Sequence, residues 1–193
     1  MTKARTDLFD SPASYGRVTR FLHWSIAGLL AWQLLVMGLK LIFGRQPFLS
    51  PLVASHQPVG TVLFVLIALR LVWAVVNRRR RPPHGTGPLG LAVVIGHALL
   101  YLLMLAVPLA ALLRVYGSER AFRPFGIELF AARDAEIGWM VEMGAALHGE
   151  LGWVLAALIL GHVAMVAVHE RVWRDGTLAR MAPQKRKRDR VLG

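Results

Sequence analysis

The sequence predicts an all-α integral membrane protein built as a four-helix bundle. Of its 193 residues, 55% are hydrophobic, and many of these fall in four long apolar runs. Each run reaches the roughly 20 residues that cross the hydrocarbon of a bilayer, and a soluble domain of this size does not carry four such runs. The chain has no cysteine, which excludes disulfides, iron–sulfur clusters and thiolate-ligated haem.

The four runs define the predicted membrane spans of a single membrane domain, which covers residues 1–193. We expect the spans at about residues 21–43, 51–76, 89–113 and 147–170. The first run follows a polar head and lacks an obvious cleavage site. It is therefore interpreted as a retained span and not as a removed signal peptide.

The connections between the spans differ in character. The segment 44–50 is short, which favours antiparallel neighbours, and 77–88 contains four arginines followed by proline and glycine, which is typical of a loop. Residues 114–146 form a longer connection of mixed charge. We expect its apolar pieces, 122–130 and 137–143, to lie on the membrane surface.

The basic residues predict the orientation of the bundle. The net charge of +12 is concentrated in the polar head, in the 77–88 loop and in a basic tail, residues 171–193. Positive residues favour the cytoplasmic side, so both termini are expected in the cytoplasm, with the 44–50 and 114–146 loops in the periplasm of a bacterial inner membrane. Such a tail could bind nucleic acid, but membrane anchoring is favoured, with lipid and no nucleic acid as the partner.

The last span carries three histidines at helical spacing. His148, His162 and His169 are separated by 14 and 7 residues, which are whole heptads, so they lie on nearly one stripe of a helix. Fourteen residues at about 1.5 Å each put the first two roughly 21 Å apart along the axis. One helix thus offers an imidazole near each membrane face, which suits two stacked metal centres.

Depth in the membrane pairs these histidines with partners on other spans. His23 starts the first span and should face His162 near the cytoplasmic side, whereas His56 starts the second span and should face His148 near the periplasmic side. Each pair could clamp one iron from opposite sides, giving two bis-histidine b haems stacked in the bundle. A zinc site, a proton relay and histidines that merely hydrogen-bond within the bundle are the alternatives.

Several other residues fit two haems in the bundle. Arg70 lies 14 residues beyond His56, and a buried arginine in lipid needs a partner, for which a haem propionate is a candidate. Small residues four positions beyond three of the histidines would keep the backbone clear of a flat macrocycle: Ala27, Gly60 and Gly152. His97 could contact a haem or quinone or be structural, and His169 could bind a quinone carbonyl or be solvated.

Four stretches carry a resemblance to a known family. They are Arg20–Trp24 (RFLHW), Gly96–Ala111 (GHALLYLLMLAVPLAA), His148–Gly152 (HGELG) and Gly161–Pro183 (GHVAMVAVHERVWRDGTLARMAP). Together they resemble the bacterial cytochrome b561 family over nearly the whole chain. The stretch from Trp173 to Pro183 is especially similar to the small four-helix branch that includes the superoxide oxidases.

The resemblance implies an activity and a set of ligands. It implies two haem b groups with axial ligands at His23, His56, His148 and His162. It further implies a superoxide:quinone oxidoreductase that oxidises superoxide to dioxygen at the periplasmic side and passes the electron through both haems to ubiquinone near the cytoplasmic side, where His169 lies. The outer pair, His56 and His148, would take the electron and the inner pair would deliver it.

A second function stays open at this point. Similar haem bundles serve as electron-transfer membrane subunits that link a periplasmic dehydrogenase or hydrogenase to the quinone pool. That function requires a redox partner docked on the 114–146 loop.

The charge of the same loop bears on superoxide as a substrate. The loop carries four arginines and five acidic residues, so its summed charge does not attract superoxide, and electrostatic steering of this anion would depend on the local arrangement of the charges.

Overall fold

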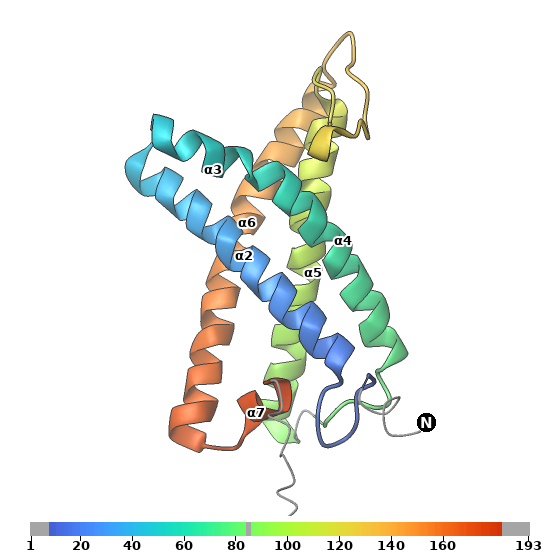
Figure 1. The fold of residues 1–193 in the computed structure, drawn as a ribbon, viewed down its shortest axis with the longest axis vertical. Coiled ribbons are helices and arrows are strands. Elements are labelled where there is room, and N and C mark those ends of the chain that lie inside the picture. The colour runs from blue at the N-terminus through green and yellow to red at the C-terminus, as the bar shows by residue number, and fades with distance from the viewer. Residues whose placement is uncertain (1–7, 84–85, 183–193) are drawn as a thin grey trace, which may run out of the picture.

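The structure, a computed structural model, describes residues 8–83 and 86–182. In this part of the chain the regular elements are helices, with one isolated β-bridge besides, and four stretches are long enough to span a membrane (Figure 1). The predicted all-α four-helix membrane bundle is confirmed. Residues 183–193 of the predicted basic tail and the first seven residues of the head lie outside the described part.

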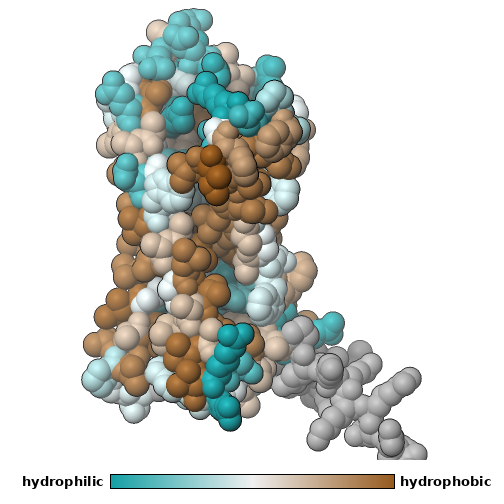
Figure 2. Space-filling view, turned by 90° about the vertical axis from the view of Figure 1, so that its left-hand side faces the viewer, coloured by the Kyte–Doolittle hydropathy of each residue, from teal (hydrophilic) through white to brown (hydrophobic). Residues whose placement is uncertain are grey.

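The helices follow one another in up-and-down order. The elements are α2 (Arg17–Phe43), η1 (Pro47–Leu49), α3 (Ser50–Ala54), α4 (His56–Val76), α5 (Gly87–Gly117), η2 (Pro124–Gly126), α6 (Gly138–Val168), a π-helical turn η3 (His169–Trp173) and α7 (Thr177–Met181). Figure 2 shows a broad apolar belt between two more hydrophilic ends. Such a belt is what the hydrocarbon of a bilayer requires.

The fourth span begins earlier than the sequence predicted. Residues 137–143 were expected on the membrane surface, but α6 begins at Gly138, so this segment forms its first turns. Close packing on α5 explains the difference, because a Cβ at Gly144 would lie 2.7 Å from the carbonyl oxygen of Ala110 and one at Gly117 would lie 2.6 Å from Cβ of Met140. Small residues permit this approach between membrane helices, and the first turns of α6 are therefore packed closely on α5.

A second helix pair is formed by α2 and α4, whose contact is the main buried core of the described residues. Ile26, Leu63 and Ile67 are buried together there, with Met104 of α5 packed against them. At the middle of α2, the indole of Trp32 donates a 3.0 Å hydrogen bond to the hydroxyl of Ser55. Ser55 separates α3 from α4, so this bond holds the corner at which α4 begins.

Both ends of the described chain meet at one end of the bundle. The carboxylate of Asp10 accepts a 2.8 Å hydrogen bond from the amide of Gly16 and pairs with Arg81 at 3.3 Å. The indole of Trp24 in turn donates to the carbonyl of Met181 at 3.0 Å, which ties α7 to the start of α2. In Figure 1 α7 lies at the lower end and the loop between α5 and α6 at the upper end.

That upper loop is a compact turn. An antiparallel bridge joins Phe122 to Phe130, and their rings stack with centroids 5.7 Å apart. Arg123 and Glu128 form an ion pair across the turn, with Nε of the arginine 2.6 Å from the carboxylate. The apolar piece 122–130, expected to lie flat on the membrane, is thus folded back on itself, with Phe122 only 3% exposed.

Candidate functional site: histidines at both ends of the bundle

One pair of imidazoles lies near the end of the bundle that carries the α5–α6 loop. The ring centroids of His56 and His148 are 5.9 Å apart, and the ring planes are perpendicular. His56 is the first residue of α4, directly after the corner, and His148 lies one third of the way along α6. The structure therefore brings together the two rings that the depth argument paired, although 92 residues separate them in sequence.

His148 is held in an orientation that leaves one nitrogen available. Its Nδ1 lies 2.9 Å from the carbonyl oxygen of Val107 on α5. A carbonyl oxygen only accepts hydrogen bonds, so Nδ1 carries the proton and Nε2 keeps a free lone pair. Metal-binding histidines are commonly oriented by this kind of bond from the opposite ring nitrogen to a backbone carbonyl.

His56 sits in a more unusual polar environment. The buried amide of Gln33 donates a 2.9 Å hydrogen bond to the backbone carbonyl of His56. Among the described residues, Nδ1 of His56 and Oε1 of Gln33 are the buried side-chain polar atoms without a hydrogen-bond partner. Lys40, on the same end of α2, lies within electrostatic reach of the His56 ring. Sequence reasoning missed Gln33, whose only signal was a polar residue inside a span.

The separation of this pair fits a single iron between the rings. An imidazole nitrogen binds a metal at about 2 Å, as at zinc, so two rings on opposite sides of one metal have centroids roughly 6 Å apart. A Cβ at Gly152, one turn beyond His148, would meet nothing within 4 Å, whereas one at Gly60 would lie 3.1 Å from Nε2 of Gln33. The glycine on the α6 side leaves room for a flat group beside its histidine.

The described residues do not gather three or more histidine, aspartate or glutamate side chains into a group suited to hold a metal ion. A zinc site built from the protein alone needs three or four such ligands. A haem iron needs only the axial ligands, because the macrocycle supplies the other four. Paired imidazoles are therefore chemically matched to haem.

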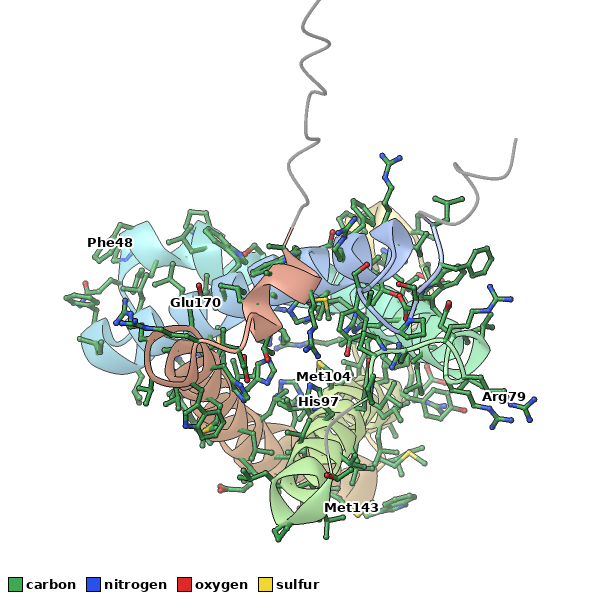
Figure 3. All side chains as sticks on the ribbon, turned by 90° about the horizontal axis from the view of Figure 1, so that it is seen from below. Phe48, Arg79, His97, Met104, Met143 and Glu170 are labelled. Atoms are coloured by element: carbon green, nitrogen blue, oxygen red, sulfur yellow. The ribbon has the colours of Figure 1, made fainter. Side chains whose placement is uncertain are left out.

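A second histidine group lies toward the opposite end. The rings of His97 and His162 have centroids 5.5 Å apart at an interplanar angle of 81°. His23 lies within electrostatic reach of His162, His97 and Arg70, and its ring packs edge-on against Trp24. Figure 3 shows His97 and Met104 toward the middle of the bundle. The predicted pairing of His23 with His162 stays a prediction, and His97 is a third imidazole in the same region.

His97 resembles His148 in its orientation. Its Nδ1 lies 2.7 Å from the carbonyl oxygen of Val93, one turn earlier in α5. Because the carbonyl can only accept, the proton is on Nδ1. The sequence left His97 open between a cofactor contact and a structural role. Its place beside His162 puts it within the candidate site.

Arg70 uses part of its guanidinium group for a hydrogen bond within the protein. One guanidinium nitrogen, Nη1, donates to the backbone carbonyl of Thr19 at 2.9 Å, and the group lies 5.9 Å from the ring centroid of Tyr101. The hydroxyl of Thr19 accepts a further 2.9 Å bond from the indole of Trp73. Arg70 thus joins α4 to α2 through one nitrogen, and its predicted contact with a haem propionate would use the others.

His169 takes part in a side-chain network at the end of the last span. Its Nδ1 lies 2.6 Å from a carboxylate oxygen of Asp175, and the amide of Thr177 donates to the other oxygen at 3.0 Å. Hydrogen bonds from Thr177 and from His169 lower the pKa of the Asp175 carboxyl to about 2. Sequence reasoning named His169 alone. The Asp-Gly-Thr turn was a signal for a local aspartate bond, but not for its histidine partner.

Comparison with known proteins links the chain to one protein family. A family profile described as prokaryotic cytochrome b561 matches residues 14–184. Among curated proteins, the chain is similar to cytochrome b561 homolog 2 of Escherichia coli strain K12. The two are 25% identical over 181 residues, which cover 89% of this chain and 93% of that protein.

Proposed function

Because the chain belongs to the prokaryotic cytochrome b561 family, we propose that it is a membrane oxidoreductase that oxidises superoxide to dioxygen and reduces ubiquinone. At the coarser level, the family is one of haem b membrane electron-transfer proteins. The finer proposal adds two haem groups, a donor and an acceptor. It places superoxide oxidation at the end of the bundle near His56 and quinone reduction at the end near His169.

The observation that carries the proposal is the placement of two groups of imidazoles, His56 with His148 and His97 with His162, toward opposite ends of one bundle. His56 and His148 would hold one haem b, and His23 and His162 the other. Bound there, the two groups would supply one-electron transfer across the membrane. The protein's part is to fix the rings, as the bond from His148 to Val107 does, and to exclude water with the apolar helices around them.

Arg70 is proposed to bind a haem propionate with the nitrogens that Thr19 leaves free. A half-buried guanidinium among membrane helices is stabilised by a negative partner. Replacing it with alanine should shift the spectrum or potential of one haem, and Arg70→Lys, which keeps the charge, should shift it less. An unchanged spectrum and potential in Arg70→Ala would refute this contact.

Local charge at the His56 end supports an anionic donor. Lys40 lies within electrostatic reach of His56, whereas the arginine of the loop turn, Arg123, is neutralised by Glu128. The guanidinium of Arg133 lies over the Tyr116 ring, 4.2 Å from its centroid. A small anion needs no acid–base chemistry for outer-sphere electron loss, so a nearby cation that raises its local concentration suffices.

The orientation follows from the basic residues. The described end with Arg78, Arg79 and Arg80 also carries α7 and the start of α2. Under the positive-inside rule this end faces the cytoplasm of a bacterial inner membrane. Superoxide would then be oxidised on the periplasmic side and quinone reduced on the cytoplasmic side.

A second candidate function has its own supporting observation. The loop between α5 and α6 exposes Phe125 (66%), Ile127 (65%) and Leu129 (53%), an apolar patch outside the four long helices. Exposed apolar patches of this kind often mark docking surfaces. A periplasmic dehydrogenase or hydrogenase docked on this loop would make the chain a haem b electron-transfer subunit that delivers electrons to the quinone pool.

Stopped-flow reduction of the purified, oxidised holoprotein by superoxide separates the two functions. We expect reduction near the diffusion limit, followed at the haem α-band by reoxidation that requires ubiquinone. Slow reduction by superoxide, with quinone reoxidation intact, would overturn the enzyme assignment and favour the electron-transfer subunit.

A further inference from the structure

The turn that follows the last span builds a hydrogen-bonded triad from His169, Asp175 and Thr177. The imidazole Nδ1 of His169 is 2.6 Å from Oδ2 of Asp175, and the backbone amide of Thr177 is 3.0 Å from Oδ1. The hydroxyl of Thr177 lies 3.5 Å from the same imidazole nitrogen. Both oxygens of one carboxylate are thus engaged, one by the histidine and one by the residue that begins α7.

The backbone around Asp175 is arranged to make this contact. Arg174 adopts a left-handed conformation with φ of 53°, and Gly176 another with φ of 70°. A left-handed non-glycine residue costs free energy and persists where the surrounding structure holds it. Here the surroundings are the π-helical turn on one side and α7 on the other, which Trp24 binds through the carbonyl of Met181.

The triad fixes which nitrogen of His169 carries a proton. With a pKa of about 2, the Asp175 carboxyl is ionised at neutral pH and can only accept hydrogen bonds. Nδ1 of His169 is therefore the donor, and Nε2 is the nitrogen left for another partner. The ring of Trp173, edge-on to the imidazole with centroids 4.5 Å apart, restricts the ring plane as well.

We propose that Asp175 is a positioning residue that holds His169 with Nε2 directed to a quinone carbonyl, so that this nitrogen delivers a proton to that oxygen during quinone reduction. The inference rests on the proposed reduction of quinone at this end. Reduction to quinol takes two electrons, supplied one at a time through the protein, and two protons. One proton leaves Nε2 of the imidazolium for the quinone oxygen that it faces, and the neutral imidazole regains a proton from water. The opposite quinone oxygen takes its proton from water.

The carboxylate does not itself transfer a proton in this scheme. It stays ionised and stabilises the imidazolium in the way that a carboxylate orients and supports a working histidine in other enzymes. The alternative is a purely structural role, in which Asp175 only connects α7 to the last span. That role predicts loss of folding or of α7 packing, and no specific change in quinone kinetics.

The experiment uses dithionite-reduced holoprotein mixed with ubiquinone-1 in a stopped-flow instrument. The variants are Asp175→Asn, Asp175→Ala and Thr177→Val, with Asp134→Asn, an exposed change at the opposite end, as the matched control. We expect the saturating rate of haem reoxidation to fall about 10–100-fold in Asp175→Ala, the size typical of losing a histidine's supporting carboxylate. The quinone concentration at half-saturation should change little, and Asp175→Asn, which can still accept the N–H, should retain more of the rate.

A second measurement reads the imidazole directly. In ¹⁵N-histidine NMR of the oxidised holoprotein, the His169 signal, assigned with His169→Gln, should show protonated Nδ1 in the wild type and a mixture of tautomers in Asp175→Ala. Wild-type rates and an unchanged tautomer in Asp175→Ala and Asp175→Asn would overturn the inference while leaving quinone reduction intact. A wild-type protein that ubiquinone-1 does not reoxidise would overturn the proposed function, and this inference with it.

Discussion

The imidazole of His148 on α6 donates its Nδ1 hydrogen to the carbonyl oxygen of Val107 on α5, across 2.9 Å. This single bond joins the tightest helix pair of the bundle to the candidate site. It places the proton of the ring on Nδ1, so that Nε2 keeps the lone pair that a metal would use. The packing of α5 on α6 therefore sets the geometry of the histidine that faces His56.

The close contact between α5 and α6 predicts a site-specific loss of stability. In Gly144→Ala the new Cβ would lie 2.6 Å from the backbone amide of Arg114 and 2.7 Å from the Ala110 carbonyl, and backbone cannot move as a side chain can. We expect a loss of about 1–3 kcal/mol in the free energy of unfolding, measured by titration with SDS in mixed micelles. Gly28→Ala, with nothing within 4 Å of the new Cβ, should not destabilise. Equal stability of the two variants would contradict this packing.

The buried carboxylate at the end with α7 predicts a second effect on stability. In Asp10→Ala the amide of Gly16 and the guanidinium of Arg81 lose their acceptor. Leaving a buried donor unsatisfied costs about 1–3 kcal/mol, so thermal unfolding of the holoprotein should occur at a lower temperature. The exposed change Asp134→Ala is the control. An unfolding temperature equal to that of the control would show that the Asp10 contacts contribute nothing.

Lys40 provides a kinetic prediction for the donor side. Removing the cation near His56 in Lys40→Gln should lower the second-order rate of reduction by superoxide by about threefold to tenfold at low ionic strength, because the local anion concentration falls. The difference should shrink as salt is added, since screening weakens interactions between exposed charges. Arg45→Gln removes an equal charge five residues further along the chain and should have the smaller effect. A larger effect of Arg45→Gln would mean that steering depends on the loop as a whole.

The depressed pKa of Asp175 gives a pH prediction. Its folded-state pKa of about 2 lies below the ordinary value of 3.8, so the stabilisation it gives is complete above the ordinary value and is lost as the pH falls through about 2. The His169–Asp175 bond should therefore persist throughout the neutral and mildly acidic range. Titration of the ¹³C-labelled carboxyl, assigned with Asp175→Asn, measures this directly. Thr177→Val, which removes the largest cause of the shift, should raise the value, and a wild-type carboxyl that titrates near 3.8 would contradict the network.

Much of the architecture follows from sequence because membrane spans are determined by local composition. The four apolar runs predicted four helices, and the end of the first at Phe43 and of the second at Val76 agree with the structure. The start of α6 was missed by nine residues, since composition does not reveal that Gly144 lets two backbones meet. Helix ends decided by tertiary packing are the part that a hydropathy pattern cannot supply.

The candidate site, too, could be predicted from the sequence only in part. The heptad spacing of His148 and His162 gave their relative depth, because depth depends only on position along one helix. Two contacts depend instead on distant parts of the chain: the approach of His97 to His162 and the bond from His169 to Asp175. The first depends on the rotational orientation of α5 about its axis, and the second depends on the left-handed backbone conformation of Arg174. Neither can be predicted from a single sequence.

The most direct test of the account is the haem b content of the purified chain and its histidine variants, measured as pyridine haemochrome per mole of protein. We expect two haems per wild-type chain, one in His148→Ala, one in His23→Ala and two in His97→Ala, because the proposed axial ligands of the second centre are His23 and His162. A wild-type chain with a single haem would contradict the paired centres. Loss of a haem in His97→Ala with both retained in His23→Ala would move the second ligand from α2 to α5.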